Sequence, residues 1–137
     1  MIHRNARGFL AAAGLLLALA TIAGALGAHA LRGVLDAQQL VSFDVAVKHQ
    51  FFHSLGLIGV ALLLDRVRDA RTQRRLAVAA WLLIAGVLCF SGSIYLLLAG
   101  GPRLLGPVTP LGGLLLIGGW LWFALAALRM PAIPRND

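Results

Sequence analysis

Long apolar runs alternate with short charged segments along the chain, and the lengths of the runs predict membrane-spanning helices. Three runs carry no formal charge, and they cover residues 8–28, 76–99 and 104–128. About 20 helical residues cross the hydrocarbon core of a bilayer, so each run is long enough. In the third run, Thr109 followed by Pro110 is typical of a helix N-cap and first helical position. The pattern therefore predicts spans over about 8–28, 76–99 and 109–128.

A further span is expected in the middle of the chain. Residues 51–64 are uncharged, but these 14 residues are too few to cross a bilayer alone. The helix must begin near residue 45, and Lys48 can extend its ammonium group to the membrane interface. We therefore expect the second span over about 45–64.

The segment before this span has an amphipathic pattern. Asp36 and Gln39 have the spacing of a capping box at a helix start. Leu40 and Phe43 then recur at helical spacing. We expect a short amphipathic helix over 36–45, which lies at the membrane surface in the first outer loop and leads into the second span.

Composition agrees with a membrane protein. The 137 residues are 60% hydrophobic and only 12% charged, whereas soluble domains average about 25% charged residues. The net charge of +7 does not indicate nucleic-acid binding, because the charges lie in short clusters between apolar runs. We expect a single all-α membrane domain over 1–137, folded as a four-helix transmembrane bundle. Cys89 is the only cysteine, so no intrachain disulfide is possible.

Basic residues predict the orientation of the chain. Nine arginines lie at the N-terminus, in the segment 65–75 and in the tail, whereas the other side carries Arg32, Lys48 and Arg103. The positive-inside rule places both termini in the cytoplasm. The first run ends in Ala-His-Ala, as a signal peptide does, but it exceeds the usual apolar region of about 7–15 residues. We therefore expect the first helix to be retained.

Small residues mark expected helix contacts. In lipid the hydrophobic effect does not draw helices together, so close van der Waals approach between small side chains contributes more. The candidate helix-packing positions are Ala20, Gly24, Ala28, Gly56, Gly112 and Gly113. The same surfaces could also pack against a second copy of the chain in a homo-oligomer, and the sequence does not distinguish helix packing within one chain from packing between two chains.

Polar residues gather in the expected outer half of the bundle. His49 and His53 are four residues apart in the segment VKHQFFHSL, and Ser91 falls at a similar depth to His53 on the third span. The candidate polar pocket consists of His29, His49, His53, Ser91, Ser93, Tyr95 and Thr109.

Several kinds of chemistry are compatible with this set. A metal site needs three or four ligands, and a histidine pair four residues apart is a weak signal for one. A transport path needs polar groups across the whole membrane, which the inner half lacks. The histidines can also simply bond to a serine, a tyrosine or the backbone inside the bundle. Ser91 and Ser93 lack a nucleophile elbow, so we expect no catalytic residue. We also expect no bound metal or other cofactor.

Three stretches together are similar to a known family: GALGAHAL at 24–31, FDVAVKHQFFHSL at 43–55, and FSGSIYLL with LGPVTPLGGLLLIGGW at 90–97 and 105–120. They resemble the DUF423 family of small bacterial inner-membrane proteins, also called UPF0382, of which the eukaryotic transmembrane protein 256 is a relative. The resemblance implies a four-helix integral membrane protein of the inner membrane, and it implies no reaction. Its motif positions here are Gly27, His29, His49, His53, Ser91, Gly92, Ser93, Tyr95, Gly106, Pro107, Thr109, Pro110, Gly112 and Gly113.

These observations lead to one main functional hypothesis and two alternatives. The main hypothesis is a non-enzymatic inner-membrane module that binds a partner protein or lipid through its outer face. The first alternative is a protein that binds a small ligand, such as a metal or haem, through the outer histidines. The second is a small transporter or channel subunit built by oligomerisation. The expected partners are the lipid bilayer and a second copy or another membrane protein, and no nucleic acid.

Overall fold

The computed structural model describes residues 4–130, and it contains four long α-helices. They are α1 (Arg4–Ala28), α2 (Ala37–Arg66), α3 (Ala70–Leu98) and α4 (Val108–Leu128). Short 3-10 helices lie in two of the connections, η1 (Ala30–Gly33) and η2 (Arg103–Leu105). No strand occurs in the described part of the chain, so the predicted all-α fold is confirmed. Arg135, which we counted for the orientation, lies outside the described residues.

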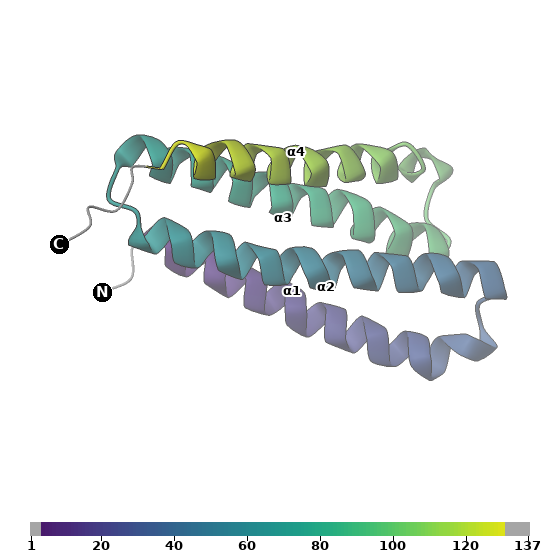
Figure 1. Cartoon of the computed structure of the whole chain (residues 1–137). Helices are drawn as coiled ribbons and strands as arrows, with labels where there is room; N and C mark the ends of the chain where they lie inside the picture. The colour runs from purple at the N-terminus through teal and green to yellow at the C-terminus, as the bar shows by residue number, and fades with distance from the viewer. Residues whose placement is uncertain (1–3, 131–137) are drawn as a thin grey trace.

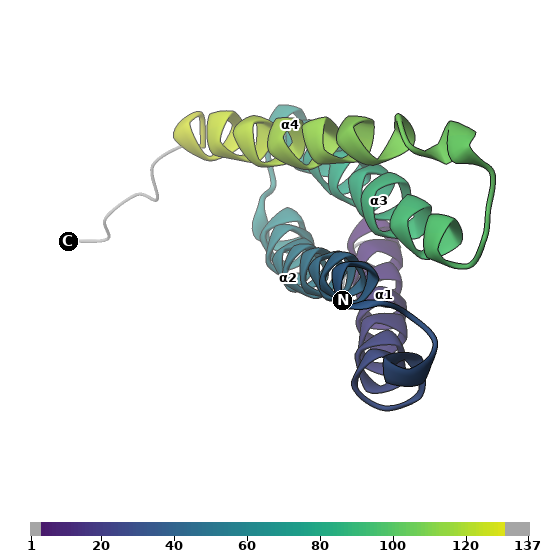
Figure 2. The same ribbon diagram turned by 90° about the vertical axis from the view of Figure 1, so that its right-hand side faces the viewer.

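The helices run up and down, and each packs mainly against its neighbour in the sequence. The contact between α3 and α4 is the most extensive, followed by α1 with α2 and by α2 with α3. Figures 1 and 2 show α1 and α4 on opposite sides of the molecule, with α2 and α3 between them. The start of α1, the α2–α3 connection and the end of α4 lie together at one end, which we call the arginine end (Figure 1). The opposite end, which carries η1 and η2, is the η end.

All four helices are long and apolar enough to cross a membrane. Within the most apolar part of each helix, only 22–33% of the residues are buried inside the protein. The outward surfaces carry large apolar side chains, such as Leu15, Phe52, Leu88 and Leu114. A soluble protein rarely exposes so much contiguous apolar surface, whereas a bilayer solvates it.

The start of α2 agrees with one prediction and corrects another. Asp36 Oδ1 accepts a hydrogen bond from the Gln39 backbone N–H at 2.8 Å, and Gln39 Oε1 accepts one from the Asp36 N–H at 2.9 Å, which completes the predicted capping box. The helix then continues without a break to Arg66. The separate amphipathic helix over 36–45 is therefore not supported. Phe43 and Ala46 belong to the same buried stripe as the residues that follow, so the segment packs as the first turns of α2.

Two other helix starts differ from the predicted ones. The α3 helix begins six residues before the expected position 76, because the Asp69 side chain accepts a hydrogen bond from Thr72 N–H and caps it. The charged first turns of α3 extend beyond the hydrocarbon core, so a prediction based on the length of the uncharged run does not include them. The predicted N-cap at Thr109 is wrong: Pro107 occupies that position, and the Thr109 hydroxyl instead contacts Ser93 of α3.

Small residues allow the helices to approach closely at several points. A Cβ atom at Gly112 would lie 2.7 Å from Phe90 Cα, so the backbones of α3 and α4 touch there. Gly56 faces the Trp120 ring, and Gly86, which we did not single out, faces Leu116. The other expected positions vary: Ala20 is buried, Gly24 faces Val47, Gly113 makes an ordinary contact with the Phe90 ring, and Ala28 is exposed.

Candidate functional site

Gln50 is the centre of a buried polar network that joins three helices. Its side chain is 4% exposed. The amide nitrogen donates a hydrogen bond to the Leu16 carbonyl of α1 at 2.8 Å, and the amide oxygen accepts one from the Tyr95 hydroxyl of α3 at 3.0 Å. We did not predict a role for Gln50. Its spacing of four from Ala46 and from Ser54 is the signal that marks it on the buried face of α2.

The hydroxyl groups of the expected polar pocket bond to backbone carbonyls, as at Ser91 and Ser93, or to other side chains, as at Tyr95 and Thr109. Ser91 donates to the Ala46 carbonyl of α2 at 2.8 Å, and it is fully buried. Ser54, which is not one of the predicted pocket residues, donates to the Gln50 carbonyl of its own helix at 2.6 Å. Ser93 and Thr109 share a hydrogen bond of 2.6 Å between their hydroxyl oxygens, which links α3 to α4. The Ser91 bond joins α3 to α2 and the Ser93–Thr109 bond joins α3 to α4, whereas the Ser54 bond lies within α2.

His49 and His53 stack on one another along α2, with their ring centroids 5.7 Å apart. His49 Nδ1 lies 2.9 Å from the Val45 carbonyl, and His53 Nδ1 lies 2.7 Å from the His49 carbonyl. A carbonyl oxygen only accepts, so Nδ1 is the donor in both contacts. The His49 ring stacks on Phe90, with the ring centroids 4.4 Å apart. His29 lies exposed after the end of α1, and no three His, Cys, Asp or Glu side chains gather around a possible metal ion within residues 4–130.

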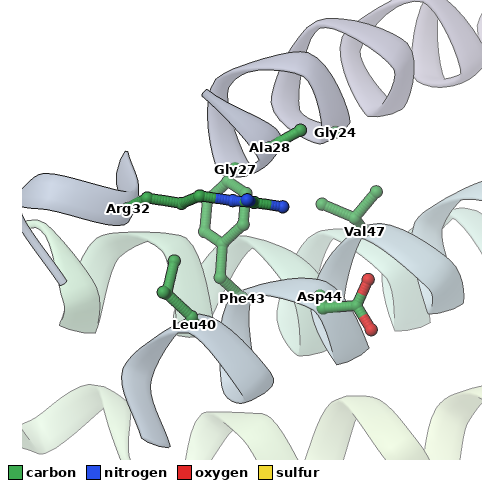
Figure 3. A pocket seen from close by; sticks show the side chains of 8 residues that line it. All are labelled: Gly24, Gly27, Ala28, Arg32, Leu40, Phe43, Asp44 and Val47. Atoms are coloured by element: carbon green, nitrogen blue, oxygen red, sulfur yellow. The ribbon is translucent and has the colours of Figure 1, made fainter. Parts of the chain in front are cut away.

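A cavity of about 620 Å³ opens at the η end between the last turns of α1 and the first turns of α2. We call it the α1–α2 groove (Figure 3). Its lining residues are Gly24, Gly27, Ala28, Arg32, Leu40, Phe43, Asp44 and Val47. The Phe43 ring packs against Gly27, where a Cβ atom would lie 2.9 Å from the ring. The glycine therefore lets the ring form one wall of the groove.

Two charged residues line this otherwise apolar groove. Asp44 forms an ion pair with Lys48, and both side chains are more than half exposed. The Arg32 side chain extends from η1 toward the groove in Figure 3. Within the described part of the chain, Arg32 has no ion-pair partner. Neither Arg32 nor Asp44 belongs to the predicted polar pocket. In the sequence, Arg32 closely follows the small residues Gly24, Gly27 and Ala28 at the end of α1, and this arrangement is the signal that could have indicated the site.

Comparison with known proteins gives a consistent result. A family model described as "Protein of unknown function (DUF423)" matches residues 23–113. A UPF0382 membrane protein of Staphylococcus haemolyticus is 40% identical over 106 residues, which cover 77% of this chain and 83% of that protein. A UPF0382 membrane protein of Bacillus subtilis is 37% identical over 111 residues, which cover 81% and 88%. A third, from Haemophilus influenzae, is 34% identical over 110 residues, which cover 80% and 85%. No solved structure matches the chain.

Proposed function

The chain belongs to the DUF423 family of integral membrane proteins, and we propose that it is a lipid-binding module that holds one anionic lipid in the α1–α2 groove. The observation that carries this proposal is the combination of apolar walls with one arginine that has no ion-pair partner among residues 4–130. The segment matched by the family model includes every residue that lines the groove.

The apolar walls of the groove suit an acyl chain but do not by themselves select one. The surrounding lipid is as apolar as the groove, so moving an acyl chain from one to the other gains little free energy. The small residues Gly24, Gly27 and Ala28 instead provide room between the helices for the chain to lie in. Selectivity must therefore come from the headgroup and from the residues that meet it.

Arg32 supplies that selectivity. The Asp44 carboxylate lies against Lys48, so these two charges offset one another. The guanidinium group of Arg32 is then the remaining cation at the groove, and its planar donors match two oxygens of a phosphate group. A basic residue near the membrane surface favours an anionic lipid by about 1 kcal/mol, which corresponds to about a fivefold preference.

The contacts of the buried serines support a binding module rather than an enzyme. Ser54 and Ser91 donate to backbone carbonyls, and within residues 4–130 neither bonds to a carboxylate or imidazole that would activate it. For location, we propose the bacterial inner membrane with both termini in the cytoplasm. The α2–α3 connection, with arginines at the adjoining ends of both helices, and both ends of the described chain lie at one end of the molecule, which supports this orientation. The groove would then face the outer leaflet.

A competition experiment tests the proposed function. The full chain is purified in mild detergent and offered equal amounts of phosphatidylglycerol and phosphatidylcholine with identical acyl chains, and the retained lipid is measured by native mass spectrometry. We expect phosphatidylglycerol to be preferred. Arg32→Gln should reduce the preference about fivefold, and Ala28→Trp should reduce retention of both lipids by filling the groove.

Arg103→Gln is the matched control, because Arg103 lies in η2 at the same end but does not line the groove. This variant should retain the preference of the natural chain. Equal preferences in the Arg32→Gln and Arg103→Gln variants would show that any lipid bound there is not recognised by the groove. The proposal would then be abandoned in favour of a surface that binds a protein partner.

A further inference from the structure

A second cavity, of about 500 Å³, lies at the arginine end and is independent of the α1–α2 groove. It is lined by Asp69, Arg71, Arg75 and Arg129. Asp69 caps α3, Arg71 and Arg75 lie in its first turns, and Arg129 caps the C-terminus of α4. Figure 1 shows the start of α3 and the end of α4 side by side at this end. Residues far apart in the sequence therefore place three arginines around one cavity.

The packing of α3 against α4 brings these like charges together. Arg71 and Arg75 are four residues apart and share one face of α3, an arrangement that is itself repulsive. Arg129 approaches them because α4 lies tightly on α3, where Gly119 faces Leu83. Three cations around one cavity raise the free energy of the folded chain unless an anion lies between them.

Asp69 offsets only part of this charge. One of its carboxylate oxygens accepts hydrogen bonds from the Thr72 hydroxyl at 2.7 Å and from the Thr72 N–H at 2.8 Å. These bonds, first that of the hydroxyl and then that of the backbone, lower the pKa of Asp69, and the backbone N–H and positive charge of Arg71 lower it further, so the carboxylate is charged. The lining of the cavity keeps two net positive charges, from three arginines and one aspartate.

A topology signal alone does not require this arrangement. Arg66 ends α2, Arg68 lies in the α2–α3 connection and Arg74 lies in the first turns of α3. They supply positive charge to this side without lining the cavity. The positive-inside rule depends on the number of basic residues near the span ends and not on which of them face one another. The convergence of Arg71 and Arg75 with Arg129 therefore calls for a separate explanation.

We infer that this cavity is a binding site for a phosphate group, held by the guanidinium groups of Arg71, Arg75 and Arg129. Guanidinium donors pair with phosphate oxygens two at a time, and three such groups match an anion with several equivalent oxygens better than a carboxylate does. The phosphate can belong to a lipid headgroup of the adjacent leaflet or to a soluble phosphate compound. Both share the chemistry that the cavity recognises, and the experiment below separates them.

The test uses the full chain in an uncharged detergent, with Arg32→Gln present throughout so that the α1–α2 groove does not contribute. Thermal unfolding is followed by tryptophan fluorescence. One arm adds inorganic phosphate, with chloride at equal ionic strength as the reference. The other arm adds phosphatidic acid, with diacylglycerol of the same acyl chains as the reference. We expect a rise in Tm with the phosphate compound in at least one arm, and the responding arm identifies the source of the phosphate.

Two sets of variants decide whether the cavity is responsible. Arg71→Gln with Arg75→Gln should abolish the rise, and Arg129→Gln, on the other helix, should weaken the apparent affinity roughly tenfold to hundredfold. Arg68→Gln with Arg74→Gln removes the same charge from outside the cavity and should keep the rise. If the two double variants lost the rise in Tm equally, the effect would depend on overall positive charge and not on the cavity, and the inference would be overturned. The absence of any phosphate-dependent rise in both arms would overturn it as well.

Discussion

Replacing Gly112 by alanine tests the contact between the backbones of α3 and α4. The new Cβ atom would lie 2.7 Å from Phe90 Cα and 2.8 Å from the Cys89 carbonyl carbon. Ordinary contacts between carbon atoms are about 3.5–4.0 Å, so the two helices must separate by roughly 1 Å. The neighbouring atoms belong to the backbone, and no side-chain rotation can relieve the clash.

The expected loss of stability follows from this geometry. Overpacking of this kind costs about 1–3 kcal/mol. The separation also stretches the Ser93–Thr109 hydrogen bond, because Thr109 and Gly112 lie one turn apart on α4 and face the same helix. A hydrogen bond between membrane helices is worth about 0.6 kcal/mol on average. We therefore expect Gly112→Ala to lower the free energy of unfolding by roughly 2–3 kcal/mol relative to a matched control.

Gly113→Ala provides that control. A Cβ atom at Gly113 would lie 3.8 Å from the Phe90 ring, which is an ordinary contact. Both substitutions gain the same helix propensity of about 1 kcal/mol, so the difference between them isolates the clash. The assay is unfolding in mixed micelles of dodecyl maltoside and sodium dodecyl sulfate, followed by circular dichroism. If the two variants unfolded at the same proportion of sodium dodecyl sulfate, the close approach of α3 and α4 would be refuted.

Other predictions concern the polar contacts. Gln50→Leu and Tyr95→Phe should each destabilise the chain in the same unfolding assay, and the double variant should show a coupling of about 0.6 kcal/mol; independent effects would mean that the two side chains do not bond. Ser91→Ala should cost about 0.6–1.7 kcal/mol through the lost bond to α2, and an unchanged midpoint would count against that bond. Asp69 has a pKa lowered by its bonds to Thr72, so its contribution to stability is present above the ordinary value of 3.8 and is lost as pH falls through the lowered pKa. Asp69→Asn should flatten the dependence of Tm on pH in this acid range, and a profile that keeps its full slope would contradict the capping role.

Much of the fold follows from patterns that are local in the sequence. The uncharged run over 8–28 lies inside α1, and the run over 76–99 lies inside α3 except for its last residue. The capping box of Asp36 lies at the start of α2. These features depend on neighbouring residues alone, because a bilayer demands apolar length and a helix end demands a nearby acceptor. The prediction erred where an element extends past the apolar run, as at Ala70, or where two helices share a polar contact, as at Thr109.

The candidate sites followed from the sequence less completely. His49 and His53 attracted attention because histidine is rare in a membrane span, yet their Nδ1 atoms bond to backbone carbonyls of their own helix. Gln50, between them, makes the contacts that join α1, α2 and α3. Residue type indicates which side chains need a partner, but it does not indicate which of them will meet one on another helix.

The sequence by itself determined that the chain has four membrane-spanning helices, because the length of each apolar run is measured against a bilayer of nearly constant thickness. Only the tertiary structure decided which face of each helix turns inward. Neighbouring residues such as His49 and Gln50 are about 100° apart around the helix axis, and both faces of a membrane helix are apolar. The choice between them depends on the close approach of small residues such as Gly112 to another helix. The same packing placed Arg129 beside Arg71, although 58 positions separate them in the sequence.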